Sequence, residues 1–250
     1  FLEWRRANRN IIKAHVGAYK EIKNIFNNVS PADLSIKNDS GAGFSISPGT
    51  SGVMSHNVGV GFAESMVFVP ETKTFLGSWL RRRYRAIRNF YFLFKATPHY
   101  DFIGLNYYGR YKLIFHISWW QKIIPWLSEE KPFAVEWESP IERRQGNRPK
   151  EFYAKGLYDL INKFKKLELP IVITENGLSD NEDKFREEFI VLHLKSIHDS
   201  IRDGANVIGY QYWALTDTWE WDGTFSQMGL IKIDRNNNLE RSLRPSAFTY

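Results

Sequence analysis

The feature that most constrains the fold is a repeat of short apolar runs separated by helical patterns. Residues 102–108, 171–174 and 207–213 are nearly continuous in apolar side chains, as strands buried on both faces are. Between these runs, residues 151–167 and 183–203 carry apolar side chains at three- and four-residue spacing, which is typical of helices packed on one side. Strand and helix in alternation predict an α/β protein with parallel strands and helices outside the sheet.

Polar and aromatic side chains end each of the three predicted strands: Asn106 and Tyr108, Glu175 and Asn176, and Trp213 with Glu220 further on. In parallel sheets and barrels, ligands bind at the carboxyl ends of the strands. No glycine-rich phosphate loop follows any of these strands, which argues against nucleotide binding on a doubly wound sheet. We therefore expect a barrel with its chemistry at one rim.

The remaining segments are predicted from periodicity and composition. Residues 11–22 have a helical pattern, and the chain begins inside it without a Met, which we interpret as a sequence cut from something longer. Residues 29–62 combine an irregular loop rich in Ser, Gly, Asn and Pro (29–52) with an apolar run (53–62) that we assign as a strand. Residues 72–97 have a helical aromatic pattern studded with Arg, which predicts one amphipathic helix.

Composition excludes several classes of function. The 34 Lys and Arg exceed the 28 Asp and Glu by 6, an excess spread over helices, so no nucleic-acid partner is expected. The chain has no Cys, which excludes disulfides and zinc-thiolate sites and fits a reducing compartment, so we expect a cytoplasmic protein. No uninterrupted apolar stretch is long enough to span a bilayer, so no membrane partner is expected. The aromatic share of 16% is high enough for rings that hold sugars beside carboxylates.

A carboxylate stands where the strand 171–174 breaks into a glycine turn, in the string ITENG at 173–177. Alone, such a Glu is usually a helix cap or a solvated loop residue. It is accompanied by DFIGLNYY at 101–108, GYQYWALTDTWEW at 209–221 and RPSAFTY at 244–250. In order and approximate spacing, these four motifs resemble glycoside hydrolase family 1, the β-glucosidase and β-galactosidase family.

The resemblance implies a (β/α)8 TIM barrel that hydrolyses β-glycosides with retention, through a covalent glycosyl-enzyme intermediate. Glu175 matches the family nucleophile, a carboxylate that must be ionised and opposed by a protonated acid. Tyr108 and Asn106 match positions that orient this nucleophile and contact the sugar. Trp213 matches the ring under the sugar of the innermost subsite, while Glu220 and Trp221 match the pair that binds outer sugar hydroxyls. The resemblance calls for a carbohydrate substrate and for no metal or cofactor.

The family acid/base is the part that this sequence lacks. Spacing alone would pair Glu175 with Glu220, because a glycosidase needs two carboxylates. In the family, however, the acid/base belongs to an Asn-Glu-Pro motif after the fourth strand, and this motif does not occur in the 250 residues. The pattern at 10–19 resembles the helix that follows that motif. We therefore expect the whole chain, 1–250, to be the C-terminal part of a single barrel domain, supplying strands five to eight, with an N-terminal half as a separate chain or an omitted segment.

Departures from the family pattern leave a second interpretation open. Lys150 stands where the family has a Trp platform for the leaving-group sugar, and the family Asn-Phe step before Glu220 reads Thr218-Trp219 here. Some family members have lost a catalytic carboxylate. The alternative is therefore a non-catalytic relative that binds glycans or proteins through the same rim.

Overall fold

The computed structural model describes residues 2–28, 59–69, 75–114, 134–138, 152–220 and 223–250. The chain divides into two compact units, Phe1–Gly61 with Phe92–Asp101, and Phe62–Tyr91 with Phe102–Tyr250. The expected loop at 29–52 and most of the expected strand at 53–62 lie outside the described residues.

The first unit is built on the helix α1 (Leu2–Asn28), which contains the predicted segment 11–22 and confirms its type. The carboxylate of Asp101 ties this unit together. It accepts hydrogen bonds from the Tyr19 hydroxyl at 3.1 Å and from the Val60 backbone N–H at 2.8 Å, and pairs with the Lys23 ammonium at 2.8 Å. These contacts outweigh desolvation and lower the pKa of Asp101.

Of the strand predicted at 53–62, only residues 59–62 are described, and the last two of them belong to a strand. The observed strand β1 runs over Gly61–Phe68, so the expectation overlaps it by only two residues. Phe62, Met66 and Phe68 are buried at alternate positions, but Glu64 and Ser65 interrupt the apolar run. The alternation of buried side chains along the chain therefore indicates this strand, and an uninterrupted apolar run does not.

The single helix expected at 72–97 is also wrong, because the structure has two helices there, α2 (Phe75–Arg88) and α3 (Tyr91–Ala96). The break falls at Asn89 and Phe90. Asn89 is buried, and the Phe90 ring packs against Phe164 at 5.3 Å between centroids. A continuous helix would keep the periodicity of the aromatic residues, so periodicity alone could not detect this turn.

The second unit contains the sheet, whose strands run in the order β1-β2-β4-β5. The strands β2 (Phe102–Ile114), β4 (Ile171–Asn176) and β5 (Val207–Tyr212) are parallel to one another. This confirms the parallel pairing predicted from the sequence. A fifth strand, β3 (Ala134–Glu138), pairs antiparallel with the far end of β2 and was not predicted.

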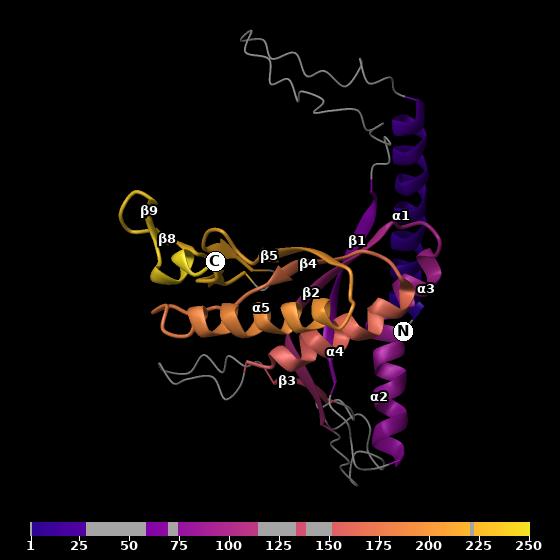
Figure 1. Ribbon diagram of the computed structural model, residues 1–250, viewed down its shortest axis with the longest axis horizontal. Helices are drawn as coiled ribbons and strands as arrows, with labels where there is room; N and C mark the ends of the chain where they lie inside the picture. Colours follow the sequence, from indigo (N-terminus) through magenta and orange to yellow (C-terminus); the bar gives the residue numbers. More distant parts are fainter. Residues whose placement is uncertain (1, 29–58, 70–74, 115–133, 139–151, 221–222) are drawn as a thin grey trace. The chain divides into compact units, whose positions relative to one another are not determined.

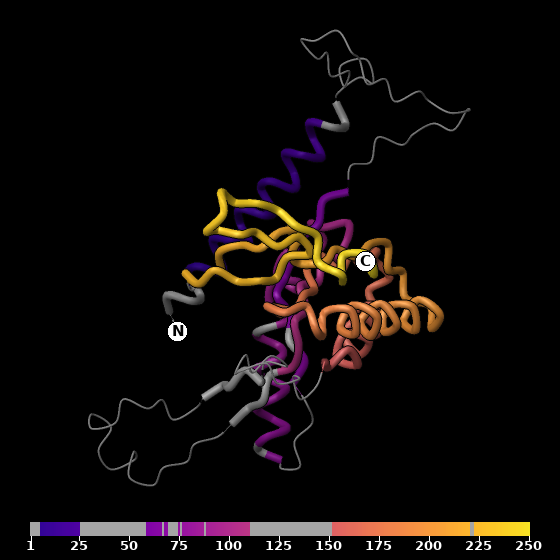
Figure 2. The backbone as a smooth tube through the Cα atoms, turned by 90° about the vertical axis from the view of Figure 1, so that its left-hand side faces the viewer, coloured from indigo at the N-terminus to yellow at the C-terminus, as the bar shows by residue number. Residues whose placement is uncertain are grey.

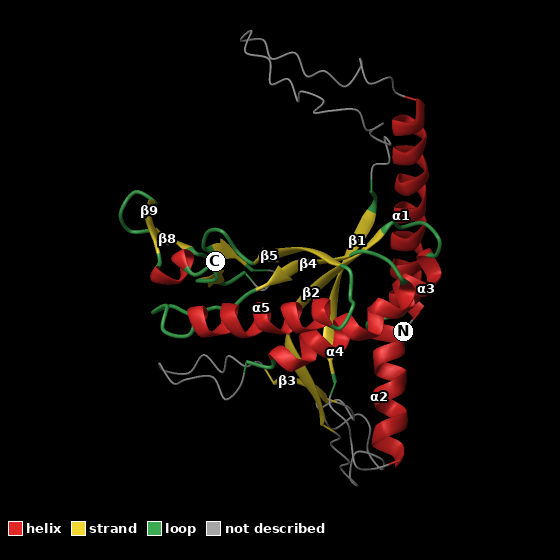
Figure 3. Cartoon of the chain, viewed as in Figure 1, coloured by secondary structure: helices red, strands yellow, loops and turns green. Residues whose placement is uncertain are grey.

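The helices that connect these strands lie next to each other (Figure 1). They are α4 (Ala154–Phe164), which ends in the 3₁₀ turn η3 (Lys165–Leu167), and α5 (Arg186–Arg202). Figure 3 shows the resulting alternation of strand and helix from β2 to β5. The core between them is apolar and includes Phe152, Leu178, Phe189, Ile190, Tyr212 and Leu230.

After β5 the chain forms two short hairpins that the sequence did not predict. The first pairs β6 (Thr218–Trp219) with β7 (Phe225–Ser226), and the second pairs β8 (Ile231–Asp234) with β9 (Glu240–Leu243). The 3₁₀ turn η4 (Pro245–Phe248) follows. Figure 2 shows this last part of the chain in yellow. Among the described helices, none has the length and apolarity needed to cross a membrane.

Candidate active site

The first candidate residues meet near the end of β4 and the middle of β2, where the parallel pairing of these two strands ends. Asn106 lies opposite Glu175 in the parallel register. The Tyr108 hydroxyl, two residues further along β2, donates a hydrogen bond of 2.6 Å to Oε2 of Glu175. A short bond to an ionised acceptor is among the stronger hydrogen bonds in proteins. The Glu175 carboxylate is therefore held in a defined orientation, with Oε1 as its other oxygen.

Tyr108 remains protonated over the working pH range of most proteins. Burial of its hydroxyl, the hydrogen bond to Glu175 and the negative charges of Glu175 and Glu220 all raise the pKa of Tyr108 above its usual value. A phenol that keeps its proton is a permanent donor to the carboxylate. The effect of Glu220 on this phenol also places both carboxylates within electrostatic range of Tyr108.

Asn106 is fixed by a neighbour on the adjacent strand. The Thr174 hydroxyl donates a hydrogen bond of 2.5 Å to Oδ1 of Asn106. Because an amide has one acceptor end and one donor end, this contact determines which way the group is turned. The Nδ2 donor end then points away from Thr174.

Asn176 is a positioning residue to which the sequence analysis gave no role. It is buried, its Nδ2 donates to the Tyr107 carbonyl at 2.7 Å, and its Oδ1 accepts from the Tyr210 hydroxyl at 3.0 Å. Its carbonyl accepts from the backbone N–H of Trp213 at 3.0 Å. One side chain thus joins β2, β4 and β5 directly beside Glu175. Its position between Glu175 and a glycine was the only available signal.

Gly177 allows the chain after β5 to come close to the end of β4. A Cβ atom at this position would lie 1.7 Å from the Trp213 carbonyl oxygen, so any side chain would displace the backbone. This approach brings Trp213 to the same edge as Glu175, with about a third of its surface exposed.

Glu220 lies at the end of β6, where its backbone N–H donates to the Thr224 carbonyl at 2.8 Å. Its Oε1 atom is buried without a hydrogen-bond partner among the described residues. A buried carboxylate oxygen without a donor is costly, and a ligand hydroxyl would satisfy it. Trp221, the predicted partner of Glu220, lies outside the described residues, as does Lys150.

A buried ion pair holds the segment between β5 and β6, and the sequence analysis missed it. The guanidinium of Arg244 pairs with the carboxylate of Asp217 through two bonds of 2.8 and 3.0 Å. The same carboxylate accepts from the backbone N–H groups of Gly229 and Ile233. The motif that contains Arg244 was identified by resemblance, but no sequence pattern shows that it contacts Asp217.

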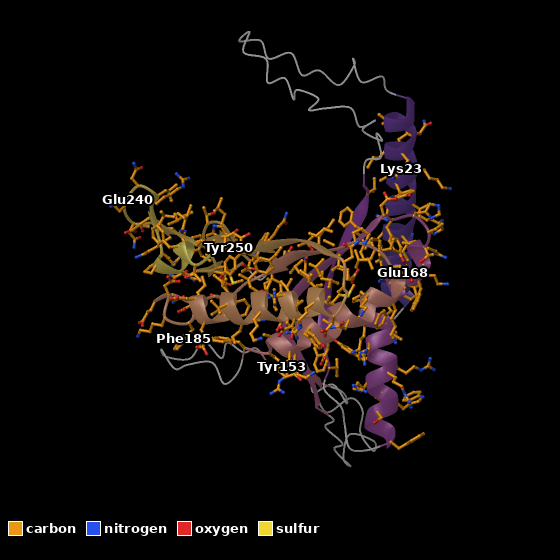
Figure 4. All side chains as sticks on the ribbon, viewed as in Figure 1. Lys23, Tyr153, Glu168, Phe185, Glu240 and Tyr250 are labelled. Carbon is orange, nitrogen blue, oxygen red and sulfur yellow. The ribbon has the colours of Figure 1, made fainter. Side chains whose placement is uncertain are left out.

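A second buried arginine anchors the start of α5. Arg186 pairs with Asp183, and its Nε donates to the Tyr212 hydroxyl at 3.0 Å. Asp183 also accepts from the backbone N–H of Ser246 at 2.8 Å and from its hydroxyl at 2.6 Å. The C-terminal segment is therefore bound to the same structure as β5, and Figure 4 shows Tyr250 beside this strand.

A groove of about 470 Å³ lies away from this edge, between α4 and α5. Its wall includes Tyr153 at the start of α4 (Figure 4). Its lysines already pair with acids one helical turn away, Lys155 with Asp159 and Lys195 with Asp199. We assign it no ligand. In the part of the chain that is described, no group of three or more His, Asp or Glu side chains could hold a metal ion.

Comparisons with known proteins agree with this geometry. Residues 90–250 match the model of glycosyl hydrolase family 1. The beta-glucosidase-like SFR2 of Oryza sativa is 37% identical over 157 residues, which are 60% of this chain and 21% of that protein. The galactolipid galactosyltransferase SFR2 of Arabidopsis thaliana is 33% identical over 151 residues, 58% of this chain and 21% of its own length.

Longer matches come from Pyrococcus. A beta-galactosidase of Pyrococcus woesei is 28% identical over 245 residues, covering 90% of this chain and 46% of that enzyme. The crystal structure of the beta-glucosidase of Pyrococcus furiosus superposes with a TM-score of 0.66 and 26% identity, covering 99% of this chain and 46% of that one. The chain thus spans between about a fifth and a half of the length of these relatives.

The parallel strands and the helices between them define an α/β fold, and the structural matches support the (β/α)8 architecture. The chain belongs to glycosyl hydrolase family 1.

Proposed function

We propose that the protein is a retaining β-glycosidase in which Glu175 is the nucleophile. The observation that carries this proposal is the 2.6 Å hydrogen bond from Tyr108 to Glu175, where the parallel pairing of β2 and β4 ends. A covalent mechanism needs a carboxylate that is held in one orientation and stays ionised. The phenol meets the first condition, because it donates a hydrogen bond to Oε2.

The chemical step follows from this arrangement. An oxygen of Glu175 attacks the anomeric carbon, and the bond to the leaving oxygen breaks as an acid protonates that oxygen. Water then attacks the anomeric carbon from the same face as the departed group and gives its proton to the conjugate base of that acid. The bond to the Glu175 oxygen breaks, which restores the carboxylate and retains the configuration. Asn106 and Trp213 contact the sugar, and Glu220 with Trp221 accepts and donates hydrogen bonds to its outer hydroxyls. The unpartnered Oε1 of Glu220 supports this role.

The acid is supplied from outside this chain. This chain provides strands five to eight of the barrel, and the complete enzyme is cytoplasmic. Two observations support the proposal. The matched chain of the Pyrococcus furiosus enzyme is about twice as long as the region aligned here. In addition, Ile208 of the edge strand β5 is 62% exposed, as expected for a face of the sheet that further elements cover.

Trapping of the intermediate tests the nucleophile. The complete enzyme, with its N-terminal half, is incubated with an activated 2-fluoro glycoside and digested for mass spectrometry. Label on Glu175 supports the proposal, and label on Glu220 contradicts it. Binding of glycan without label or turnover would instead favour the non-catalytic alternative.

Sugar transfer is a second candidate function, favoured by the name of the Arabidopsis relative. The same glycosyl-enzyme can be attacked by a sugar hydroxyl in place of water, which moves the glycosyl group without hydrolysis. Product analysis distinguishes the two: free sugar equal to the released aglycone indicates hydrolysis. A deficit of free sugar that is matched by a lengthened acceptor indicates transfer.

A further inference from the structure

The helix α2 has an unusual charge. Its 14 residues contain five arginines and neither Asp nor Glu. Arg81 is turned toward the protein, where its guanidinium donates to the Val69 carbonyl. Gly77, two residues after Phe75, is buried. These residues define the side of α2 that packs on its own unit.

The opposite side of α2 combines large apolar side chains with cations. Residues spaced three or four apart lie on one helix face, and those exposed here are Phe75, Trp79, Arg82, Arg83 and Ala86. Phe75 is 84% exposed and Trp79 is 43% exposed. The Arg83 guanidinium lies over the Trp79 ring, 5.3 Å from its centroid. We call these five residues the α2 face.

Isolated exposed apolar residues are ordinary, but this combination is specific. Phe and Trp prefer the boundary between lipid headgroups and acyl chains, and arginines beside them pair with headgroup phosphates. At about 1.5 Å per residue, α2 is about 21 Å long, so the face can lie flat on a bilayer. None of this involves Glu175 or the edge that holds it.

Two other occupants fit less well. In a symmetric contact between two copies, the same surface of each copy meets the other. Arg82 and Arg83 of one copy would then lie near Arg82 and Arg83 of the other, which brings like charges together. A nucleic-acid backbone would pair with the arginines but would leave Phe75 without a contact. Of these three occupants, the anionic lipid surface is the one that uses both kinds of side chain.

We propose that the α2 face binds the surface of membranes that contain anionic lipids. This proposal revises the expectation of no membrane partner, but only for binding at the membrane surface. It does not predict that the chain spans a membrane. Each arginine near such a surface increases binding by about fivefold, and the buried rings add an apolar contribution that does not depend on salt.

Vesicle flotation tests this proposal with the full-length protein that contains this chain. Vesicles of phosphatidylcholine with phosphatidylglycerol are compared with vesicles of phosphatidylcholine alone. Arg82→Gln with Arg83→Gln should lower binding to the anionic vesicles by about 25-fold, and Phe75→Ser with Trp79→Ser by roughly tenfold. A control pair with the same change in charge, Lys166→Gln with Arg241→Gln, should bind like the wild type, because both residues are exposed outside α2.

Circular dichroism and thermal melting check that every variant is folded, which is expected because all of the changed side chains are exposed or half-exposed. The proposal is wrong if the wild type shows no preference for anionic vesicles, or if the control pair loses as much binding as the arginine pair. It is also wrong if the same arginines are needed to bind a DNA duplex while the Phe75 and Trp79 substitutions change nothing.

Discussion

Acidic and basic side chains occur both at the carboxyl edge of the sheet and on the outer surface of α4 and α5. They are buried at the edge and exposed on the outer surface. At the edge, Asp217 is buried and accepts from one guanidinium and two backbone N–H groups. On the outer surface, the Lys195 side chain is 67% exposed and pairs with Asp199 one turn away. Several fixed partners define a position, whereas one exposed pair defines very little. The difference shows which charges hold the site.

The largest effect is expected at Glu175. Glu175→Ala in the complete enzyme should lower kcat by at least about 10³-fold, because covalent catalysis loses its attacking group. Steady-state hydrolysis of an aryl glycoside measures this loss, and azide should restore part of the rate by entering the space left by the carboxylate. A variant that keeps most of its activity would exclude Glu175 as the nucleophile.

The buried pair should matter most for stability. Arg244→Met leaves the Asp217 carboxylate buried without its cation, which typically costs about 3–5 kcal/mol. Denaturant unfolding measures the loss. The double variant Arg244→Met with Asp217→Leu should recover much of it, because it removes the unpaired charge as well. If the single variant were as stable as the wild type, the network would not determine the position of this segment.

His193 shows that burial, and not the helix on which a residue lies, decides its effect on stability. It lies on α5, but its side chain faces the core. Burial lowers the pKa of His193 to about 4, and its Nδ1–H donates to the Phe189 carbonyl at 2.8 Å. The unfolded chain binds this proton near its ordinary pKa of about 6.5. The resulting stability is therefore complete above that pH and is lost as the pH falls toward 4, by about 3 kcal/mol in total.

His193→Leu should flatten that part of the pH dependence, as measured by denaturant unfolding at pH 7 and pH 4.5. The matched control is His198→Gln on the same helix, where the side chain is 76% exposed. The control should keep the wild-type slope. Equal slopes for all three proteins would mean that His193 does not titrate on unfolding.

Tyr108→Phe tests the contact that orients the proposed nucleophile. Loss of a hydrogen bond to a charged group typically costs about 1.5–3 kcal/mol, so formation of the glycosyl-enzyme should slow by about 10- to 150-fold. Stopped-flow burst kinetics with an activated substrate separates this step from hydrolysis of the intermediate. A burst rate equal to that of the wild type would leave Tyr108 a merely structural role.

The smallest effect is expected on the outer surface. Lys195→Met should change the free energy of unfolding by less than about 0.5 kcal/mol, and salt should remove even that difference. Unfolding at low and high salt provides the measurement. A loss comparable to that of Arg244→Met would overturn the contrast between the two regions.

The sequence predicted the parts of the fold that depend on local pattern. Residues 102–108, 171–174 and 207–213 form parallel strands because their apolar runs need burial on both faces. The two predicted helices between them appear as α4 and α5. Tyr108 and Glu175 were named from motifs, and the structure brings them into contact, while their catalytic roles remain predictions.

What could not be predicted depends on contacts between distant residues. Arg244 and Asp217 are 27 positions apart, and no periodic pattern links them. The turn at Asn89 is set by the packing of Phe90 on Phe164, which a helical pattern conceals. The short hairpins β6–β7 and β8–β9 have strands of two and four residues, too short for alternation to be recognised.

The close approach at Gly177 has a consequence for experiments that substitute every position in turn and score function. Position 177 should be as intolerant as position 175, although it does no chemistry, since a Cβ there would meet the Trp213 carbonyl. A functional screen alone would place both in the same class. A parallel screen for soluble, folded protein separates them: Gly177→Ala should be depleted in both screens, and Glu175→Ala only in the screen for activity.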